Sequence, residues 1–95
     1  MKSSTRLASA DLNGRITHVT YQIEGFDRLS FVSDIAAIVP QDDSYSIRAL
    51  CFEADGVQAY GVLTVRMREE NRQTGFLVQR LQSVLGIVSV REIKS

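Results

Sequence analysis

Hydrophobic and polar side chains alternate along residues 16–24, ITHVTYQIE. In an extended chain, Val19, Tyr21 and Ile23 lie on one side, and the polar residues between them lie on the other. A period of two residues is typical of a strand with one buried face. We therefore predict a strand over residues 16–24, and the GFDR tetrapeptide that follows it predicts the turn that ends it.

The period changes to that of a helix over residues 29–39. The apolar positions with helical spacing are Leu29, Val32, Ile35, Ala36 and Val39. Asp27 or Ser30 is placed to cap the start of this helix. Pro40 ends it, because a residue that precedes proline disfavours the helical conformation. We expect the apolar stripe, beginning at Leu29, to enter the core.

Residues 45–67 predict two strands joined by a tight turn, because Asp55-Gly56 suits the positive φ of hairpin turns. Both faces of this hairpin carry apolar side chains. The alternating sets are Leu50 and Phe52 against Ile47, Ala49 and Cys51 on the first strand, and Tyr60 and Val62 against Ala59, Gly61 and Leu63 on the second. The two helices can cover only one face of the sheet. The other face then exposes an apolar patch of a size that monomers rarely expose. We predict a homodimer whose interface includes Leu50, Phe52, Tyr60 and Val62.

A second amphipathic helix and a last strand complete the pattern. The helical stripe consists of Phe76, Leu77, Leu81, Val84 and Leu85. Asn71 or Thr74 is placed to cap this helix, Gly86 to end it, and residues 87–93 alternate as a strand. The order β-α-β-β-α-β predicts an α+β ferredoxin-like sandwich, in which a four-stranded antiparallel sheet carries two helices on one face.

Residues 1–15 are polar and predict a flexible lead-in or linker, which leaves residues 16–95 as one domain. The 11 basic and 11 acidic residues balance to a formal net charge of zero, so charge alone gives no footprint for nucleic acid. The single cysteine, Cys51, lies in an apolar run and is expected to be buried. The chain has neither an apolar run of about 20 residues nor the apolar core of a signal peptide, and we predict a cytoplasmic protein without membrane contact.

The sequence contains no recognisable catalytic set, so we predict no catalytic residues, metal or cofactor for this chain. His18, the only histidine, has no partner at ligand spacing, and no phosphate-binding loop or Cys-His arrangement is present. Three classes with the predicted fold match poorly. A metal chaperone would need two cysteines in the first loop, an RNA-recognition domain would need a basic surround for Tyr21 or Tyr60, and an acylphosphatase would need an asparagine placed to assist Arg28.

A fourth class fits better: the chain resembles the ACT domain family of regulatory modules. The matching features are the strand ending IEGFDR, the helix LSFVSDIAAIV and the late run LVQRLQSVLGIVSVREI, which together span about residues 16–93. Within that family the chain is most similar to the C-terminal ACT domain of RelA/SpoT-type (p)ppGpp synthetase/hydrolases, the GTP pyrophosphokinases. The similarity lies in GFDR, in the hairpin FEADGVQAYGVLTV and in the ending GIVSVREI.

The resemblance implies a non-catalytic domain that controls the stringent response from the C-terminal part of such an enzyme. It implies contacts with the other domains of the parent enzyme, an amino-acid effector, and contacts with the ribosome and tRNA. The ligand site it implies is the first loop, namely Gly25, Phe26, Asp27, Arg28, Leu29 and Ser30. Ser30 stands where many family members have glycine, so we predict weak or absent binding of free amino acids. A stand-alone amino-acid sensor and a pure dimerisation module remain as alternatives.

Overall fold

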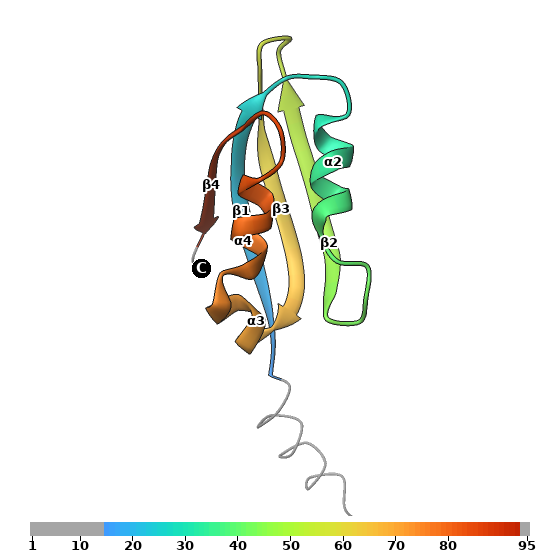
Figure 1. Cartoon of the computed structure of the whole chain (residues 1–95), viewed down its shortest axis with the longest axis vertical. Coiled ribbons are helices and arrows are strands. Elements are labelled where there is room, and N and C mark those ends of the chain that lie inside the picture. The colour runs from blue at the N-terminus through green and yellow to red at the C-terminus, as the bar shows by residue number, and fades with distance from the viewer. Residues whose placement is uncertain (1–14, 94–95) are drawn as a thin grey trace, which may run out of the picture.

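The computed structural model describes residues 15–93, which form a single four-stranded antiparallel sheet and three helices (Figure 1). The order along the chain is β1 (Ile16–Phe26), α2 (Phe31–Ile38), β2 (Tyr45–Ala54), β3 (Gln58–Arg68), α3 (Glu69–Thr74), α4 (Phe76–Gln82) and β4 (Ile87–Ile93). The strands lie in the order β2-β3-β1-β4. The predicted lead-in lies outside the described residues, except for Arg15.

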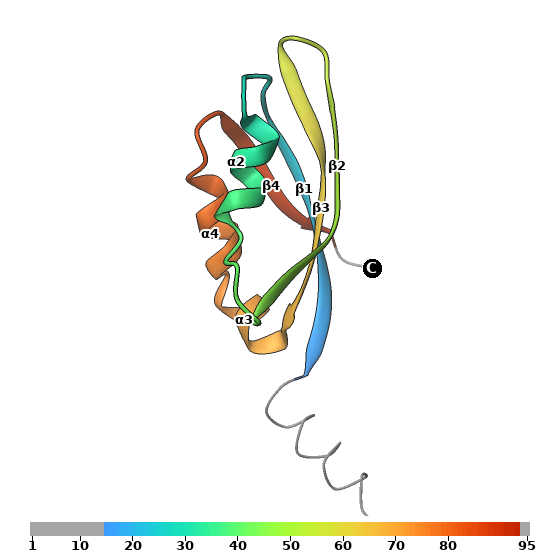
Figure 2. The ribbon, with the colours of Figure 1, turned by 90° about the vertical axis from the view of Figure 1, so that its right-hand side faces the viewer.

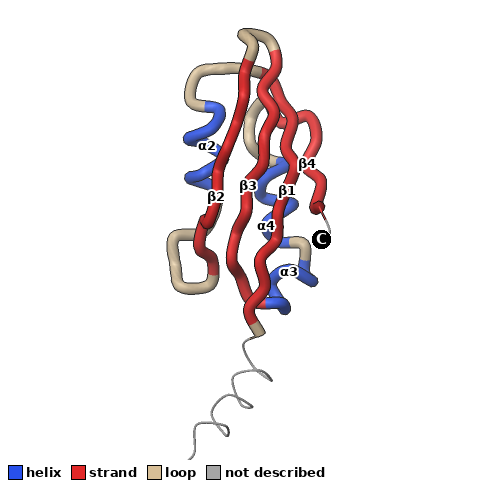
Figure 3. Tube along the Cα trace, turned by 180° about the vertical axis from the view of Figure 1, so that it is seen from behind, coloured by secondary structure: helices blue, strands red, loops and turns tan. Residues whose placement is uncertain are grey.

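The helices cover one face of the sheet, and the other face carries none of the described helices (Figures 2 and 3). This arrangement confirms the predicted ferredoxin-like sandwich. β1 and β3 pair over their full lengths, from Ile16 opposite Arg68 to Phe26 opposite Gln58. β2 and β4 form the two edges. We call the helix-free side the open face.

The core lies between the sheet and the helices. The alternation predicted for β1 is confirmed, because Val19, Tyr21 and Ile23 are at most 3% exposed. Alternate residues of β3 also point into the core, and apolar residues of the helices pack against them. The remaining buried apolar residues are Phe31, Ile35, Val39, Ala59, Leu63, Val65, Met67, Leu77, Leu81 and Val84.

A β-bulge in β2 overturns the predicted grouping of the hairpin. The pairing of β2 with β3 shifts between Ile47 and Ala49, so the alternation changes phase at Arg48. After the bulge, Leu50 pairs with Leu63 and therefore faces the helices, and so does Phe52, whose ring packs edge-on against Phe31. This fixes the position of two members of the predicted interface. Leu50 and Phe52 belong to the helix side, and the prediction that they share a surface with the other two members was wrong.

The same change of phase places Ala49 and Cys51 on the open face, on the same side as Tyr60 and Val62 of β3. Tyr60 is 48% exposed, and Val62 pairs with Cys51 on the same side of the sheet. Cys51 is exposed, so the prediction that it is a buried hydrophobe was wrong. Gly61 is required for a different reason. A Cβ there would meet the Cys51 carbonyl oxygen and lie 2.6 Å from Phe52 Cγ, so the ring of Phe52 can cover this strand only where β3 has no side chain.

The first helix starts two residues later than predicted. α2 begins at Phe31, and its buried face consists of Phe31 and Ile35. Leu29 lies in the preceding loop and is 92% exposed, so its predicted place in the core was wrong. The side chain of Phe31 takes that place, because the turn at Ser30 rotates the start of the helix.

The second helical stripe is divided in two. Gly75 has φ 70° and separates α3 from α4, and the Thr74 hydroxyl accepts a hydrogen bond from the Phe76 N–H. α4 ends at Gln82, and Gly86, with φ 95°, lies in the turn that leads into β4 rather than directly after the helix. Leu85 is 76% exposed, so the prediction that it continues the buried stripe was wrong.

Candidate functional site at the loop end

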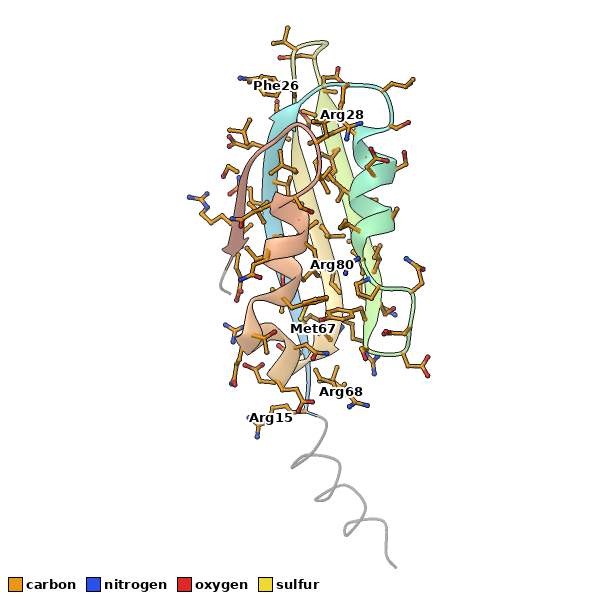
Figure 4. The ribbon with its side chains drawn as sticks, in the orientation of Figure 1. Arg15, Phe26, Arg28, Met67, Arg68 and Arg80 are labelled. Carbon is orange, nitrogen blue, oxygen red and sulfur yellow. The ribbon has the colours of Figure 1, made fainter. Side chains whose placement is uncertain are left out.

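Three loops meet at one end of the sheet, which we call the loop end: the β1–α2 loop, the β2–β3 turn and the α4–β4 turn. Asp27 N–H donates to the Val57 carbonyl at 3.0 Å, and Gly56 N–H donates to Asp27 Oδ2 at 2.8 Å. Phe26 N–H donates to the Gly86 carbonyl at 2.9 Å. These bonds make one unit from segments that are distant in the sequence. Figure 4 shows Phe26 and Arg28 at this end and Arg15 and Arg68 at the opposite end.

Arg28 is the principal cation of the loop end, and three of its five N–H donors are engaged within the domain. Its Nε donates to the Leu85 carbonyl at 2.8 Å, and its two terminal nitrogens donate to the Leu29 carbonyl and to Asp34 Oδ2, both at 2.8 Å. Its guanidinium also lies 5.6 Å from the ring centroid of Phe31. An arginine that binds a carboxylate ligand needs free, forked donors. Arg28 instead connects the α4–β4 turn to α2.

Asp27 and Ser30 do not act as the side-chain caps that the sequence suggested. Asp27 accepts from Gly56 instead. Ser30 occupies the N-cap position, but its side chain makes no capping hydrogen bond. Its backbone is left-handed, with φ 67° and ψ 13°. Ser30 thus adopts the conformation that glycine favours, at a cost of roughly 1–2 kcal/mol for a residue with a Cβ.

The residues of the predicted ligand stretch are divided between two hollows. Gly25 and Phe26 line a hollow of about 300 Å³ on the open face, together with Tyr60 and Val88. Asp27, Arg28 and Ser30 line a shallower hollow of about 510 Å³ between α2 and β2. Leu29 lines neither, because its side chain points to solvent. The stretch therefore does not form one site.

Gly25 is needed for the close approach of the loop end to the core. It lies at an irregularity in the pairing of β1 with β4. A Cβ at this position would clash with the ring of Phe31 and would lie 2.6 Å from the Gly86 carbonyl oxygen. The glycine lets the Phe31 ring and the turn before β4 pack directly on the backbone of β1.

Two titratable groups near the loop end have shifted pKa values, and both shifts have structural causes. Hydrogen bonds from the backbone N–H groups of Gln58 and Val57 lower the pKa of Asp55. The neighbouring carboxylate of Glu53 raises the pKa of Tyr60, whose hydroxyl donates to Glu53 Oε1 at 3.3 Å. Within residues 15–93, no group of three or more His, Cys, Asp or Glu residues is placed to hold a metal ion.

The loop end also exposes a cluster of apolar side chains. Its members are Phe26 (59% exposed), Leu29 (92%), Val57 (68%), Leu85 (76%) and Val88 (62%). We call these five residues the apolar rim. Sequence patterning missed the exposure of Val57, Leu85 and Val88. Phe26 and Val88 line the hollow on the open face, and Leu85 lines another one beside Asp34 of α2, so the rim surrounds the loop end rather than forming one patch.

None of the helices within residues 15–93 is long and apolar enough to cross a membrane.

Neither a protein-family model nor a curated protein sequence matches the chain. Solved structures do match its fold. The crystal structure of the ACT domain from the GTP pyrophosphokinase of Chlorobium tepidum superposes with a TM-score of 0.69 at 19% identity, covering 82% of this chain and 99% of that domain.

The solution structure of the same Chlorobium tepidum domain gives a TM-score of 0.68 at 19% identity, covering 84% of this chain and 89% of the other. The chain therefore has the fold of an ACT domain. Both of these structural neighbours are ACT domains of a GTP pyrophosphokinase, the enzyme group to which the sequence resemblance also pointed.

Proposed function

We propose that this chain is a non-catalytic regulatory ACT domain of a cytoplasmic RelA/SpoT-type (p)ppGpp synthetase/hydrolase and that it takes part in control of the stringent response. The observation that carries the proposal is the superposition on an ACT domain from a GTP pyrophosphokinase over nearly all of that domain. The similarity of the GFDR turn, the hairpin and the last strand supports the same assignment independently of the coordinates.

The domain would act through contact of its apolar rim with other domains of the parent enzyme. The rim residues come from strand ends and from three loops. Asp27 binds Gly56 and Val57 of the β2–β3 turn, and hydrogen bonds from Phe26 to Gly86 and from Arg28 to Leu85 hold the α4–β4 turn. A contact at the rim is thereby transmitted to the core, because Arg28 and the Phe31 ring link the rim to α2. Such a linkage can couple docking of the domain to the balance of synthesis and hydrolysis.

A stand-alone amino-acid sensor is the second candidate, and the hollow between α2 and β2 is the feature that favours it. Two details of that hollow count against it. Each of the three Arg28 nitrogens already donates a hydrogen bond within the domain, and Ser30 places a side chain where close approach of a ligand to the backbone needs glycine. A pure dimerisation module would use the sheet alone and would leave the rim without a role.

The test compares three purified proteins: the whole native polypeptide that contains this segment, the same polypeptide without residues 15–93, and the isolated segment. We expect both (p)ppGpp synthesis and (p)ppGpp hydrolysis from the first two proteins. The third protein, the isolated segment, should catalyse neither reaction. Removal of the segment should change the ratio of synthesis to hydrolysis by about fivefold or more, the lower range of allosteric coupling. A native polypeptide without either activity, or an unchanged ratio, would contradict the proposal.

A further inference from the structure

A hollow of about 300 Å³ lies on the open face of the sheet, close to the loop end. The side chains of Glu24, Phe26, Tyr60 and Val88 line it. In the register of β1 with β3, Tyr60 pairs with Glu24, and the next residue on the same face of β1 is Phe26. Diagonal neighbours of this kind are within reach of aromatic side chains. Two aromatic rings from adjacent strands therefore border one space.

Val88 reaches this space because of the irregularity in the pairing of β1 with β4. Glu24 pairs with Ser89 and Gly25 pairs with Ile87, so Val88 is the extra residue between them. An extra residue in a strand re-aims its side chain, and Val88 is 62% exposed. Three strands thus contribute to the walls, and the aliphatic group of Val88 forms the wall on the side of β4.

The aromatic faces at the hollow have no partner among residues 15–93. The rings that meet one another are Phe31 with Phe52 and Tyr45 with Phe76, and guanidinium groups lie over the rings of Phe31 and Phe76. Phe26 and Tyr60 take part in none of these contacts, and they are 59% and 48% exposed. The face of an aromatic ring is negative and attracts a cation that lies within about 6 Å of the ring centroid. The hollow therefore offers two free aromatic faces to a cation.

Two carboxylates flank Tyr60, because Glu53 of β2, Tyr60 of β3 and Glu24 of β1 lie in one row across the sheet. The Tyr60 hydroxyl donates to Glu53 Oε1 at 3.3 Å, and the negative charge of Glu53 raises the pKa of Tyr60. The ion pairs formed within residues 15–93 include neither carboxylate. Arg91 of β4 lies opposite Gln22, one row away, and its guanidinium donates to Gln22 Oε1. The negative charge at the hollow is therefore not paired with a cation of the described residues.

We propose that the hollow binds the guanidinium group of an arginine on another protein segment. The guanidinium stacks against the rings of Phe26 and Tyr60 and donates to the carboxylate of Glu24. Charge complementarity selects this partner, because the walls combine free aromatic faces with unpaired negative charge. Any segment with an exposed arginine fits, whether or not it belongs to a (p)ppGpp synthetase/hydrolase.

The size and the walls of the hollow favour an arginine side chain over other cations. Pockets that enclose whole small molecules begin at about 300 Å³ and bury most of the ligand. This hollow is only that large and is open to solvent at its two exposed rings. A guanidinium is planar, stacks on aromatic rings and donates two parallel hydrogen bonds to a carboxylate. An ammonium group is a strongly hydrated point charge and gains less from such walls.

Short peptides test the chemistry of the hollow. The whole 95-residue chain is titrated with acetyl-Gly-Arg-Gly-amide, and its backbone amide shifts are followed by NMR. We expect saturable binding at millimolar peptide, with the shift changes centred on Gly25, Phe26, Ala59 and Tyr60. A peptide with citrulline in place of arginine keeps the shape and loses the charge, so it should bind more weakly by about fivefold or more. A peptide with lysine in place of arginine should also bind more weakly than the arginine peptide.

Three single substitutions locate the binding site. Glu24→Gln and Tyr60→Leu should each weaken binding of the arginine peptide by about threefold, within the range for one exposed ion pair or cation–π contact. Glu70→Gln removes the same charge at an exposed residue of α3, at the opposite end of the sheet (Figure 1), and should leave binding unchanged. Circular dichroism verifies that each variant folds.

Absence of saturable binding of the arginine peptide would overturn the proposal, and so would equal binding of the citrulline or the lysine peptide. Variants Glu24→Gln and Tyr60→Leu that bind the arginine peptide as the Glu70→Gln control does would place the contact elsewhere and overturn it as well. A peptide with leucine in place of arginine that binds as tightly would show that the hollow takes an apolar side chain instead.

Discussion

The N–H group of Gly56 donates a 2.8 Å hydrogen bond to Asp27 Oδ2, which ties the β2–β3 turn to the β1–α2 loop. The Asp27 N–H makes the reverse contact, to the carbonyl of Val57. The two bonds hold together loops that are about 30 residues apart along the chain. They fix the position of Val57 of the apolar rim relative to the β1–α2 loop.

Asp27→Ala should lower the free energy of unfolding by about 1 kcal/mol, because it removes a hydrogen bond to a charged acceptor at a partly exposed site. Urea unfolding followed by circular dichroism measures the change. Asp43→Ala, at an exposed aspartate of the α2–β2 loop, is the matched control and should change stability by less than about 0.5 kcal/mol. Equal effects of the two substitutions would show that the Asp27 contact contributes nothing.

Ser30→Gly should stabilise the fold by about 0.5–1 kcal/mol. The left-handed backbone of Ser30 costs roughly 1–2 kcal/mol with a Cβ present, and the greater freedom of glycine in the unfolded chain offsets part of the gain. Ser33→Gly, the same change three residues later and inside α2, should destabilise by about 1 kcal/mol. Thermal unfolding of both variants should give shifts of opposite sign, and a destabilising Ser30→Gly would contradict the backbone conformation described here.

The buried phenol of Tyr21 should make the fold sensitive to alkali. Burial raises the pKa of Tyr21 to about 12, and the negative charge of Glu92 adds to the effect. A group whose folded pKa lies above its unfolded value of about 10 stabilises the fold fully below pH 10, and that contribution is lost as the pH rises towards 12. The loss amounts to about 2 kcal/mol at pH 12. Tyr21→Phe should therefore lose less stability between pH 10 and pH 12 than the wild type, as measured by urea unfolding at each pH. Parallel losses in the two proteins would contradict the account.

The order of elements and most of the core could be predicted from the sequence, because both follow from local periodicity. β1 shows the alternation without interruption, and its buried residues are those expected. The bulge at Arg48 could not be predicted, because one extra residue inverts every later side chain while leaving the composition of the strand unchanged. That single residue explains why Leu50, Phe52 and Cys51 were placed on the wrong faces.

The start of α2 shows a second limit. Leu29 and Phe31 both fit helical spacing with the apolar residues that follow, so periodicity alone does not choose between them. The choice is made by the left-handed turn at Ser30, which serine seldom adopts and which the sequence therefore did not suggest. The predicted turn at GFDR begins too early, because Gly25 and Phe26 still belong to β1 and the loop begins only at Asp27. Its division between two hollows depends on contacts with the β2–β3 and α4–β4 turns, and no local pattern contains these contacts.

The central claim is that the apolar rim of this domain controls the balance of two opposing activities in a (p)ppGpp synthetase/hydrolase. The most direct measurement uses the whole native polypeptide with Val57→Asp and Leu85→Asp, two side chains that are 68% and 76% exposed and whose replacement should leave the fold intact. Gln79→Asp, an exposed position on α4, adds negative charge away from the rim as the control. We predict that the rim variant changes the ratio of (p)ppGpp synthesis to hydrolysis by about fivefold or more, while the control leaves it unchanged. A rim variant with the same ratio as the wild type would contradict the claim.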